Sequence, residues 1–293
     1  MPSGSSLRSK AEILLVVVTL FWGATFVIVK EALNDASPLV FIAGRFTLAG
    51  ILLWFAVGER KLKRKSLGPA LALGALLFVG YIFQTWGQEY TTPSKCAFIT
   101  GFSVVLVPLI VAAMGASLRP ANAAGALLGL AGIFFLTAPL GGRTVNRGDL
   151  LTLVAATSFA AYIVLLEFYN RRHSFAQLAP PQILAVGVFA FVLLPLDHNR
   201  RFHWTPGLGW ALGVTEVFAT AFAFGVQTWA QKYVPASHTA LIFTLEPVFA
   251  AVTSYVVLGE RLGGRVLIGA GLVLVGMVVS ELWGGRSNRP AKD

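Results

Sequence analysis

The chain alternates between long apolar stretches and short polar connections through nearly all of its 293 residues. A helix needs about 20 mostly apolar residues to cross the hydrocarbon layer of a bilayer. Ten stretches come close to this length, and the connections between them contain the Pro, Gly, Asn and charged residues that end helices. The pattern predicts ten transmembrane helices, near residues 12–32, 38–58, 68–88, 94–114, 121–137, 148–168, 177–195, 208–230, 236–258 and 266–283.

Hydropathy alone leaves this count open, but an internal repetition decides it. The stretch at 121–137 is short and the one at 177–195 contains Pro180-Pro181, so nine or eleven spans also fit. Residues 84–97 (QTWGQEYTTPSKCA) and 227–240 (QTWAQKYVPASHTA) are identical at seven of fourteen positions and lie 143 residues apart. This spacing indicates a duplicated unit of five helices.

The duplication predicts the architecture. The two units are placed at 12–137 and 148–283, joined by a Gly- and Arg-rich linker at 138–147. Because five is odd, the second unit enters the membrane from the opposite side, and such inverted repeats are a recurrent architecture of secondary transporters. The predicted fold class is an all-α integral membrane protein: ten transmembrane helices as two inverted five-helix repeats around a central cavity.

Corresponding positions of the two units carry informative residues. The register places Lys30 opposite Glu167, Arg45 opposite Gln182, Gly50 opposite Gly187, and Gly125 and Gly132 opposite Gly269 and Gly276. We interpret the last four glycines as helix-packing residues, with a dimer contact as an alternative. The predicted oligomeric state is a monomer or a weak homodimer.

Composition agrees with a membrane protein and limits its partners. The chain is 56% hydrophobic and only 12% charged, with a mean hydropathy of +0.74, whereas soluble chains are about one quarter charged. The net charge of +10 lies mainly in connections and tails, so we interpret it as membrane topology and expect no nucleic-acid partner. Cys96 is the single cysteine, which excludes an internal disulfide and offers no cysteine cluster for a metal. No cofactor is expected.

The distribution of Lys and Arg predicts the orientation. With a cytoplasmic N-terminus, 14 of the 23 Lys and Arg fall inside, 8 fall outside and Arg45 lies within a span. We therefore expect residues 1–11 and the tail 284–293 to be cytoplasmic, in a multi-pass protein of the cell (inner) membrane. The first apolar stretch exceeds a usual signal sequence and no small-residue cleavage site follows it, so it is expected to remain as a helix.

Ionisable residues within spans are candidates for function, because they are costly there unless they face a partner or a cavity. Four qualify: Arg45, Glu216, His238 and Glu246. Arg45 needs an anion or a ring of acceptors, in a binding site or in a structural ion pair. Glu216 or Glu246 would carry a coupling proton or make a structural hydrogen bond, and the sequence does not decide between these roles.

Polar residues at helical spacing predict the lining of a hydrated cavity. The candidates, with the four ionisable residues, are Trp22, Thr25, Tyr81, Gln84, Gln88, Thr100, Ser103, Gln182, Thr220, Gln227 and Gln231. Glu216, Thr220, Gln227 and Gln231 would share one helix face. The glutamines of the repeated motif would line an outer and an inner gate, or link helices by hydrogen bonds. Its Trp and Tyr residues also suit the aromatic belts at the membrane surface.

Several short motifs resemble those of a known family. They are Phe21-Trp22-Gly23-Ala24-Thr25-Phe26, Arg45-Phe46, Leu245-Glu246-Pro247-Val248-Phe249 and Leu258-Gly259-Glu260-Arg261-Leu262. In this order they resemble the drug/metabolite transporter superfamily, in its EamA-type branch of ten-helix proteins with two EamA repeats. The resemblance implies movement of small metabolites or drugs, often export, through a cavity between the halves. The first half departs from the pattern, since its corresponding turn, Gly115-Ala116-Ser117-Leu118-Arg119, has no glutamate.

The leading hypothesis is a transporter that exports amino-acid-like or other small organic solutes by alternating access, with membrane lipid around it and the proton as a candidate coupling ion. The alternative is a passive channel or facilitator that uses the same cavity. An intramembrane enzyme lacks support, because the chain contains no HExxH, GxSxG or phosphate-binding loop motif.

Overall fold

The computed structural model describes residues 4–57, 62–115, 119–137 and 146–284, and apart from one isolated β-bridge the regular structure there is helical. The first half contains α1 (Gly4–Ala32), α2 (Pro38–Val57), α3 (Arg64–Tyr90), α4 (Pro93–Gly101), α5 (Ser103–Ala113) and α6 (Pro120–Thr137). The second contains α7 (Arg147–Asn170), α8 (Phe175–Leu193), the 3₁₀ turn η1 (Leu194–Leu196), α9 (Pro206–Glu216), the π-helical η2 (Val217–Phe222), α10 (Ala223–Ala230), α11 (Ala236–Phe243), α12 (Glu246–Leu258) and α13 (Gly264–Gly284).

These elements form ten spans, because α4 continues into α5, α9 runs through η2 into α10, and α11 continues into α12. Eight of the spans are long and apolar enough to cross a membrane, and the apolar parts of α6 and α13 are somewhat shorter. The predicted ten-helix membrane fold is confirmed within the described residues. Most of the predicted linker (138–147) and tail (284–293), and residues 116–118 of the first-half turn, lie outside them.

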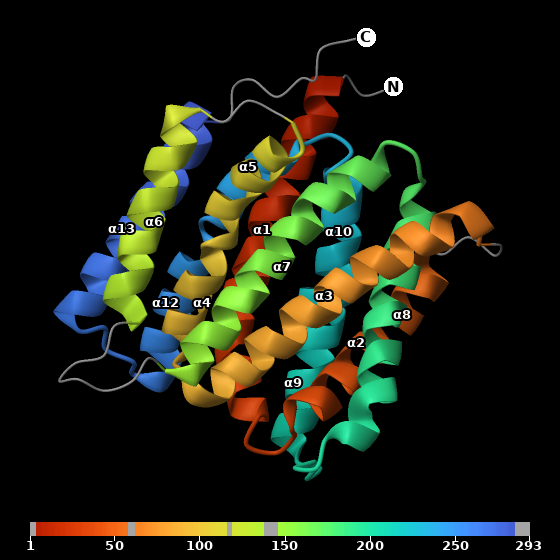
Figure 1. Cartoon of the computed structure of the whole chain (residues 1–293). Helices are drawn as coiled ribbons and strands as arrows, with labels where there is room; N and C mark the ends of the chain where they lie inside the picture. Colours follow the sequence, from red (N-terminus) through yellow and green to blue (C-terminus); the bar gives the residue numbers. More distant parts are fainter. Residues whose placement is uncertain (1–3, 58–61, 116–118, 138–145, 285–293) are drawn as a thin grey trace.

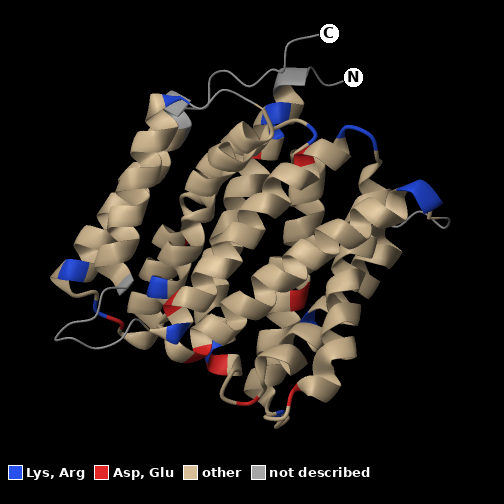
Figure 2. Ribbon diagram, in the orientation of Figure 1, with Lys and Arg blue, Asp and Glu red and all other residues tan. Residues whose placement is uncertain are grey.

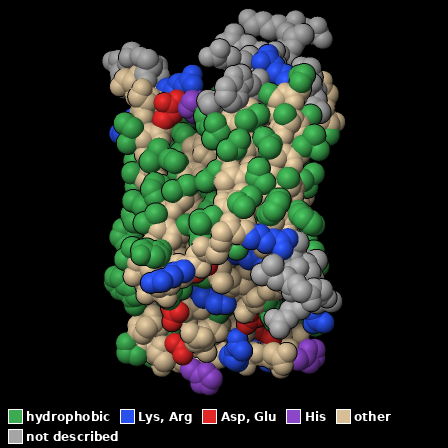
Figure 3. All heavy atoms as spheres, turned by 90° about the vertical axis from the view of Figure 1, so that its left-hand side faces the viewer, with side chains coloured by type: hydrophobic (Ala, Val, Ile, Leu, Met, Phe, Trp, Pro, Cys, Tyr) green, Lys and Arg blue, Asp and Glu red, His purple; other side chains and the backbone are tan. Residues whose placement is uncertain are grey.

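The spans run up and down through the bundle, so α1 begins and α13 ends at the same end, drawn at the top of Figure 1. We call this end the terminus side and the opposite end, where α1 finishes, the far side. Charged residues gather toward both ends (Figure 2), and hydrophobic side chains cover most of the face that contains α6 and α13 (Figure 3). This distribution is the one expected of a protein that spans a bilayer.

Two spans near the centre are broken at corresponding positions. α4 gives way to α5 at Phe102, and α11 gives way to α12 at Thr244 and Leu245. Phe102 and Leu245 are 143 residues apart, the spacing of the repeated motif. In the second repeat Pro247 follows the break and lacks a backbone N–H, so it fits the first turn of a new helix better than the middle of a continuous one. The sequence predicted single spans over 94–114 and 236–258, and the division of each into two helices is a correction to those elements.

Glycines bring the last helix of each repeat into backbone contact. A Cβ atom built on Gly276 of α13 would lie 2.7 Å from the carbonyl oxygen of Gly125 in α6, and one on Gly132 would lie 2.7 Å from that of Gly269. Only glycine allows this approach. The helix packing predicted for these four residues is therefore between α6 and α13 of the same chain.

Substitution of Gly276 by alanine is expected to destabilise the protein, because the added methyl group overlaps the α6 backbone. A cost of about 1–3 kcal/mol is typical of such overpacking. The measurement is the thermal unfolding midpoint of the purified protein in detergent. Gly271→Ala on the same helix is the matched control, since its Cβ would meet nothing within 4 Å. Equal midpoints for the two variants would contradict the contact.

Candidate functional site

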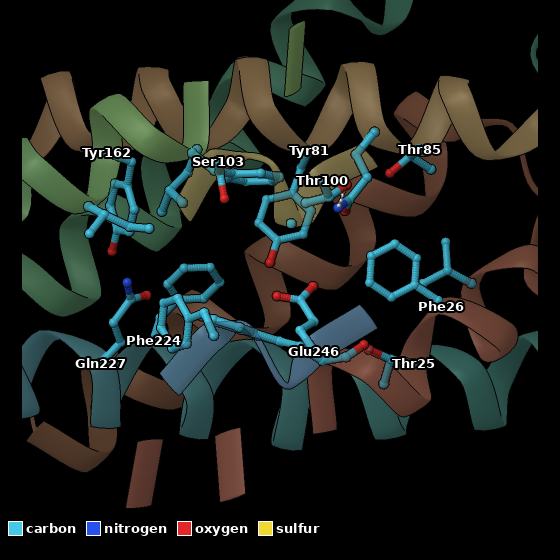
Figure 4. Close-up of a pocket in the computed structure, with 18 of the residues that line it drawn as sticks. Thr25, Phe26, Tyr81, Thr85, Thr100, Ser103, Tyr162, Phe224, Gln227 and Glu246 are labelled. Carbon is cyan, nitrogen blue, oxygen red and sulfur yellow. Dashed lines mark hydrogen bonds between the residues drawn. The ribbon is translucent and has the colours of Figure 1, made fainter. Parts of the chain in front are cut away.

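A cavity of about 60 Å³ lies between the two halves of the chain. One water needs roughly 10–15 Å³ on this measure, so there is room for several waters or a few ligand atoms. Helices α1 to α5 line it from the first half, and α7, α10, α11 and α12 from the second (Figure 4). The lining residues are Trp22, Thr25, Phe26, Val29, Arg45, Leu77, Tyr81, Gln84, Thr85, Gln88, Thr100, Gly101, Ser103, Val104, Phe159, Tyr162, Ile163, Phe224, Gln227, Phe243 and Glu246.

Most residues predicted from the sequence to line a cavity come together at this one. Those that do are Trp22, Thr25, Arg45, Tyr81, Gln84, Gln88, Thr100, Ser103, Gln227 and Glu246. The other five do not border it and are Gln182, Glu216, Thr220, Gln231 and His238. The reason why a residue lies outside the cavity differs among these five.

Arg45 reaches from α2 to the π-helical segment η2. Its Nε atom donates a hydrogen bond to Oγ1 of Thr220 at 2.7 Å, and its Nη2 atom donates to the carbonyl oxygen of Ala219 at 3.3 Å. The indole Nε1 of Trp22 donates to the same carbonyl at 2.9 Å. The guanidinium carbon also lies 5.1 Å from the centre of the Tyr81 ring. Arg45 therefore borders the cavity while two of its nitrogen atoms hold η2 against α1 and α2.

The π-helical segment explains why the predicted polar face of the eighth span does not form. Glu216, Thr220, Gln227 and Gln231 share a face only if the helix keeps 3.6 residues per turn, and six residues of η2 follow a wider repeat. Of the four, only Gln227 lines the cavity. Glu216 is partly exposed away from it, and the hydroxyl of Thr220 is used by Arg45 and by the carbonyl oxygen of Thr215.

Two other predicted cavity residues act as links between helices. Nε2 of Gln231 donates to the carbonyl oxygen of Ile163 in α7 at 3.2 Å, and its Oε1 accepts from Gln227 at 3.1 Å. Nε2 of Gln182 in α8 donates to Oγ1 of Thr228 in α10 at 2.9 Å. These contacts favour the interpretation in which glutamines link helices by hydrogen bonds.

His238 lies at the terminus side, outside the cavity. Its Nε2 atom is 3.3 Å from Oε1 of Glu12, which also accepts from Nε of Arg8 at 2.9 Å. The side chain of His238 is about one third exposed. An exposed side chain with a charged neighbour suits a position near the membrane surface, and His238 lies away from the cavity.

Glu246 is the one carboxylate among the cavity residues. It is the first residue of α12, so the break in the ninth span sets its position. Its carboxylate points into the cavity toward the hydroxyl of Tyr81 (Figure 4). No hydrogen bond or ion pair joins that carboxylate to another group in the described part of the chain. Gly23 makes room for this end of α12, since a Cβ there would lie 2.7 Å from the Glu246 carbonyl oxygen.

The sequence did not single out the aromatic residues that form much of the wall. They are Phe26, Phe159, Tyr162, Phe224 and Phe243. In apolar helices such residues look like ordinary core. The repeat offered one signal, because Phe224 lies 143 residues after Tyr81 and therefore occupies the corresponding position.

At each end of the bundle, a charged residue at the corresponding repeat position bonds the backbone of another span. At the far side, Nζ of Lys30 donates to the carbonyl oxygens of Gln88, Glu89 and Thr91 at the end of α3. At the terminus side, Oε2 of Glu167 accepts from the backbone N–H of Ala236 at the start of α11, at 2.8 Å. A cation suits the C-terminal end of a helix, and an anion suits the N-terminal end. We call these contacts the Lys30 latch and the Glu167 latch.

Glu260 adds a second contact at the far side. It follows Gly259, whose φ of 64° ends α12, and its Oε2 accepts from Oγ of Ser94 at 2.8 Å and from Oγ of Ser254. The glutamate of the Leu-Gly-Glu-Arg-Leu motif therefore ties the end of α12 to the start of α4.

Three of the four aromatic residues of the repeated motif lie at the surface, and Trp229 is partly buried against the core. Trp86, Tyr90 and Tyr233 have 36%, 57% and 38% of their surface exposed. Trp86 and Tyr90 border a second hollow of about 1340 Å³ at the far side, whose wall also contains Glu89, Arg200 and Arg201. It is a separate space from the cavity between the halves.

Comparison with known sequences now decides the family. A sequence model of the EamA-like transporter family matches residues 9–138 and again residues 146–281. The chain belongs to this family. It is therefore a multi-pass membrane transporter rather than an enzyme, and the predictions of the family and of two EamA repeats are confirmed.

Individual relatives agree with this assignment. An Archaeoglobus fulgidus protein named as an uncharacterized transporter is 34% identical over 276 residues, which cover 94% of this chain and 87% of the relative. The Bacillus subtilis transporter YoaV is 24% identical over 91% of this chain and 94% of its own. A solved crystal structure aligns with a TM-score of 0.69 at 22% identity, over 94% of this chain and 98% of that chain. This last likeness supports the fold alone.

The contact of Arg45 with η2 predicts that Thr220→Val destabilises the transporter. Valine keeps the volume but removes the acceptor of a buried charged donor, which typically costs about 1.5–3 kcal/mol. Thermal unfolding in detergent measures the effect. Thr157→Val is the matched control, because Thr157 is exposed and bonds only within its own helix. In an Arg45→Met background, Thr220→Val is expected to cost much less. An unchanged cost there would contradict the coupling.

Proposed function

We propose that the chain exports small organic metabolites, amino-acid-like solutes or drugs, by alternating access. We place it in the inner membrane, with both termini in the cytoplasm. One observation carries the proposal. The cavity lies between two repeats, and at each end of the bundle a charged residue at the corresponding repeat position bonds two of the helices that line the cavity together. Two contacts of this kind suit a transporter in which one end of the cavity opens while the other end stays closed.

The latches support this because each joins elements that border the cavity. Lys30 holds α1 to the end of α3, next to Gln88. Glu167 holds α7 to the start of α11, close in sequence to Gln227 of α10 and to Gln231, the residue that follows α10. Breaking one latch frees one end of the cavity lining and leaves the contacts of the other end in place.

The broken spans support movement at the same level. Both breaks, at Phe102 and at Thr244-Leu245, lie beside lining residues, namely Thr100, Ser103, Phe243 and Glu246. A broken helix bends at less cost than a continuous one, because fewer backbone hydrogen bonds cross the break. The cavity is small, so a solute larger than a few atoms requires the lining helices to move apart.

Glu246 is the candidate site for a coupling proton. It is the one carboxylate that lines the cavity, and it has no partner among the described side chains. A carboxylate in this position exchanges a proton with whichever side the cavity faces. Glu216, the alternative named from the sequence, does not border the cavity.

The proposed orientation predicts the labelling of two single cysteines by a membrane-impermeant maleimide in intact cells. Arg200→Cys at the far side is expected to react and Arg172→Cys at the terminus side is expected to be protected until the cells are permeabilised. Both positions are exposed, and the native Cys96 is buried. The reverse pattern would place the termini outside.

Alternating access predicts opposite changes at the two ends of the cavity when one latch is removed. In a Cys96→Ser background, Lys30→Met is expected to increase maleimide labelling of Gln88→Cys from the far side. It is also expected to decrease labelling of Gln227→Cys from the terminus side, several-fold in each case. Glu167→Gln should have the opposite pair of effects. Lys10→Met, an exposed lysine of the same helix, serves as the control.

The same measurement separates a transporter that alternates from a passive channel. In a channel the two ends open independently, so Lys30→Met would leave the labelling of Gln227→Cys unchanged. Flux of a panel of metabolites in proteoliposomes completes the test. Absence of transport for every solute in both directions would refute the proposal.

A further inference from the structure

Acceptors without a donor gather in the lining of the cavity. Gln88 and Gln227 are 2% and 1% exposed, and the Oε1 atom of each is buried without a donor in the described part of the chain. Nε2 of Gln227 is already used by Gln231, which leaves its oxygen as the free end. Glu246 adds a carboxylate with no partner among the described residues, and Tyr162 adds a hydroxyl that either donates or accepts. A buried acceptor left unpaired costs free energy, so this wall favours a ligand that donates hydrogen bonds.

The cation of the cavity is less available. Arg45 is 4% exposed, its Nε and Nη2 atoms donate to Thr220 and Ala219, and its guanidinium lies beside the Tyr81 ring. To bind a ligand carboxylate through these two atoms, Arg45 would have to give up its contacts with η2. The ionisable group of the cavity that has no partner among the described residues is therefore an acid.

The walls suit an organic cation. Trp22, Phe224 and Phe243 pack together, with ring centres of Trp22 5.4 Å from Phe224 and 5.1 Å from Phe243. Aromatic faces attract cations, most strongly where water is excluded. They also receive the apolar part of a small molecule. Carboxylate, amide oxygens and aromatic rings together form an environment for a protonated amine.

We propose that the cavity selects organic amines in their protonated form, with the ammonium group on the Glu246 carboxylate and the amide oxygens of Gln88 and Gln227 as further acceptors in the lining. This inference rests on the proposed transport function and specifies its substrate class. A ligand that carries only a carboxylate meets the acid of Glu246 in place of a free cation and is excluded. A zwitterion binds less well than the matching amine, because its carboxylate meets Glu246 and finds Arg45 already bonded at two nitrogen atoms.

Three ligands that share a phenyl ring and a short chain test the proposal: phenethylamine, phenylalanine and 3-phenylpropionate. Their binding to the purified full chain in detergent is measured by calorimetry. Phenethylamine is expected to bind at least tenfold more tightly than phenylalanine, and 3-phenylpropionate is expected not to bind. Equal or tighter binding of either carboxylate-bearing ligand would overturn the inference.

Single substitutions test which residues produce the selectivity for the amine. Glu246→Gln keeps the size of the side chain and removes the charge, so the affinity for phenethylamine should fall at least tenfold. Glu216→Gln removes a carboxylate that lies within a span but outside the cavity, and it should bind like the unaltered protein. Gln88→Leu and Gln227→Leu should each lower the affinity for phenethylamine by a smaller factor. Unchanged affinity in Glu246→Gln would refute the assignment.

Folding and function are checked separately. The thermal midpoint of Glu246→Gln shows whether the variant is folded, and Glu246→Asp, which keeps the charge, should retain the preference for phenethylamine over 3-phenylpropionate. If the folded unaltered protein binds no amine, the inference is wrong. The transporter proposal then still stands if any other solute crosses the proteoliposome membrane, and falls only if none does.

Discussion

The structure depends on one constraint: inside a bilayer, every backbone N–H and C=O group has to find its partner within the protein. This requirement makes every span helical and makes each departure from a regular helix a place where other groups supply the missing contacts. In η2, Arg45 and Trp22 provide donors to the carbonyl oxygen of Ala219. The breaks at Phe102 and at Thr244-Leu245 lie beside the cavity, where irregular backbone is tolerated. The two breaks therefore coincide with the candidate site, and η2 is joined to it through Arg45 and Trp22, which line the cavity.

The same constraint explains which parts of the structure the sequence predicted. Span positions follow from hydropathy, because a hydrocarbon layer needs a minimum length of apolar residues, and most predicted helix ends fall within a few residues of the observed ones. The inverted repeats followed from counting helices in a duplicated unit. The ten residues that line the cavity were named from 3.6-residue periodicity or as ionisable residues within a span, and periodicity failed at Glu216 and Thr220 because η2 changes the repeat. Nothing in Val217–Phe222 distinguishes it from an α-helical segment by composition. The aromatic wall was missed because hydropathy treats a phenylalanine facing a cavity and one facing the core alike.

Duplication preserved positions while the chemistry at them diverged. Lys30 and Glu167 occupy corresponding places, yet one binds carbonyl oxygens at a helix end and the other binds an N–H group at a helix start. Each contact is favourable because the two ends of a helix carry opposite partial charges. Glu260 shows a similar divergence, since the first half has no glutamate in its corresponding turn. A repeated architecture therefore does not imply equal stability at its two ends, and the ends can be tuned independently.

The glycine contact between α6 and α13 has a mechanical consequence. No residue of either helix lines the cavity, and their backbones meet directly at two points without side chains between them. Sliding one helix along the other would drive Cα atoms and carbonyl oxygens into each other, whereas a small rotation about the seam keeps both points in register. The pair has the properties of a fulcrum: it holds the last helix of each repeat at a fixed separation, and under the proposed alternating access the two repeats would rock about it.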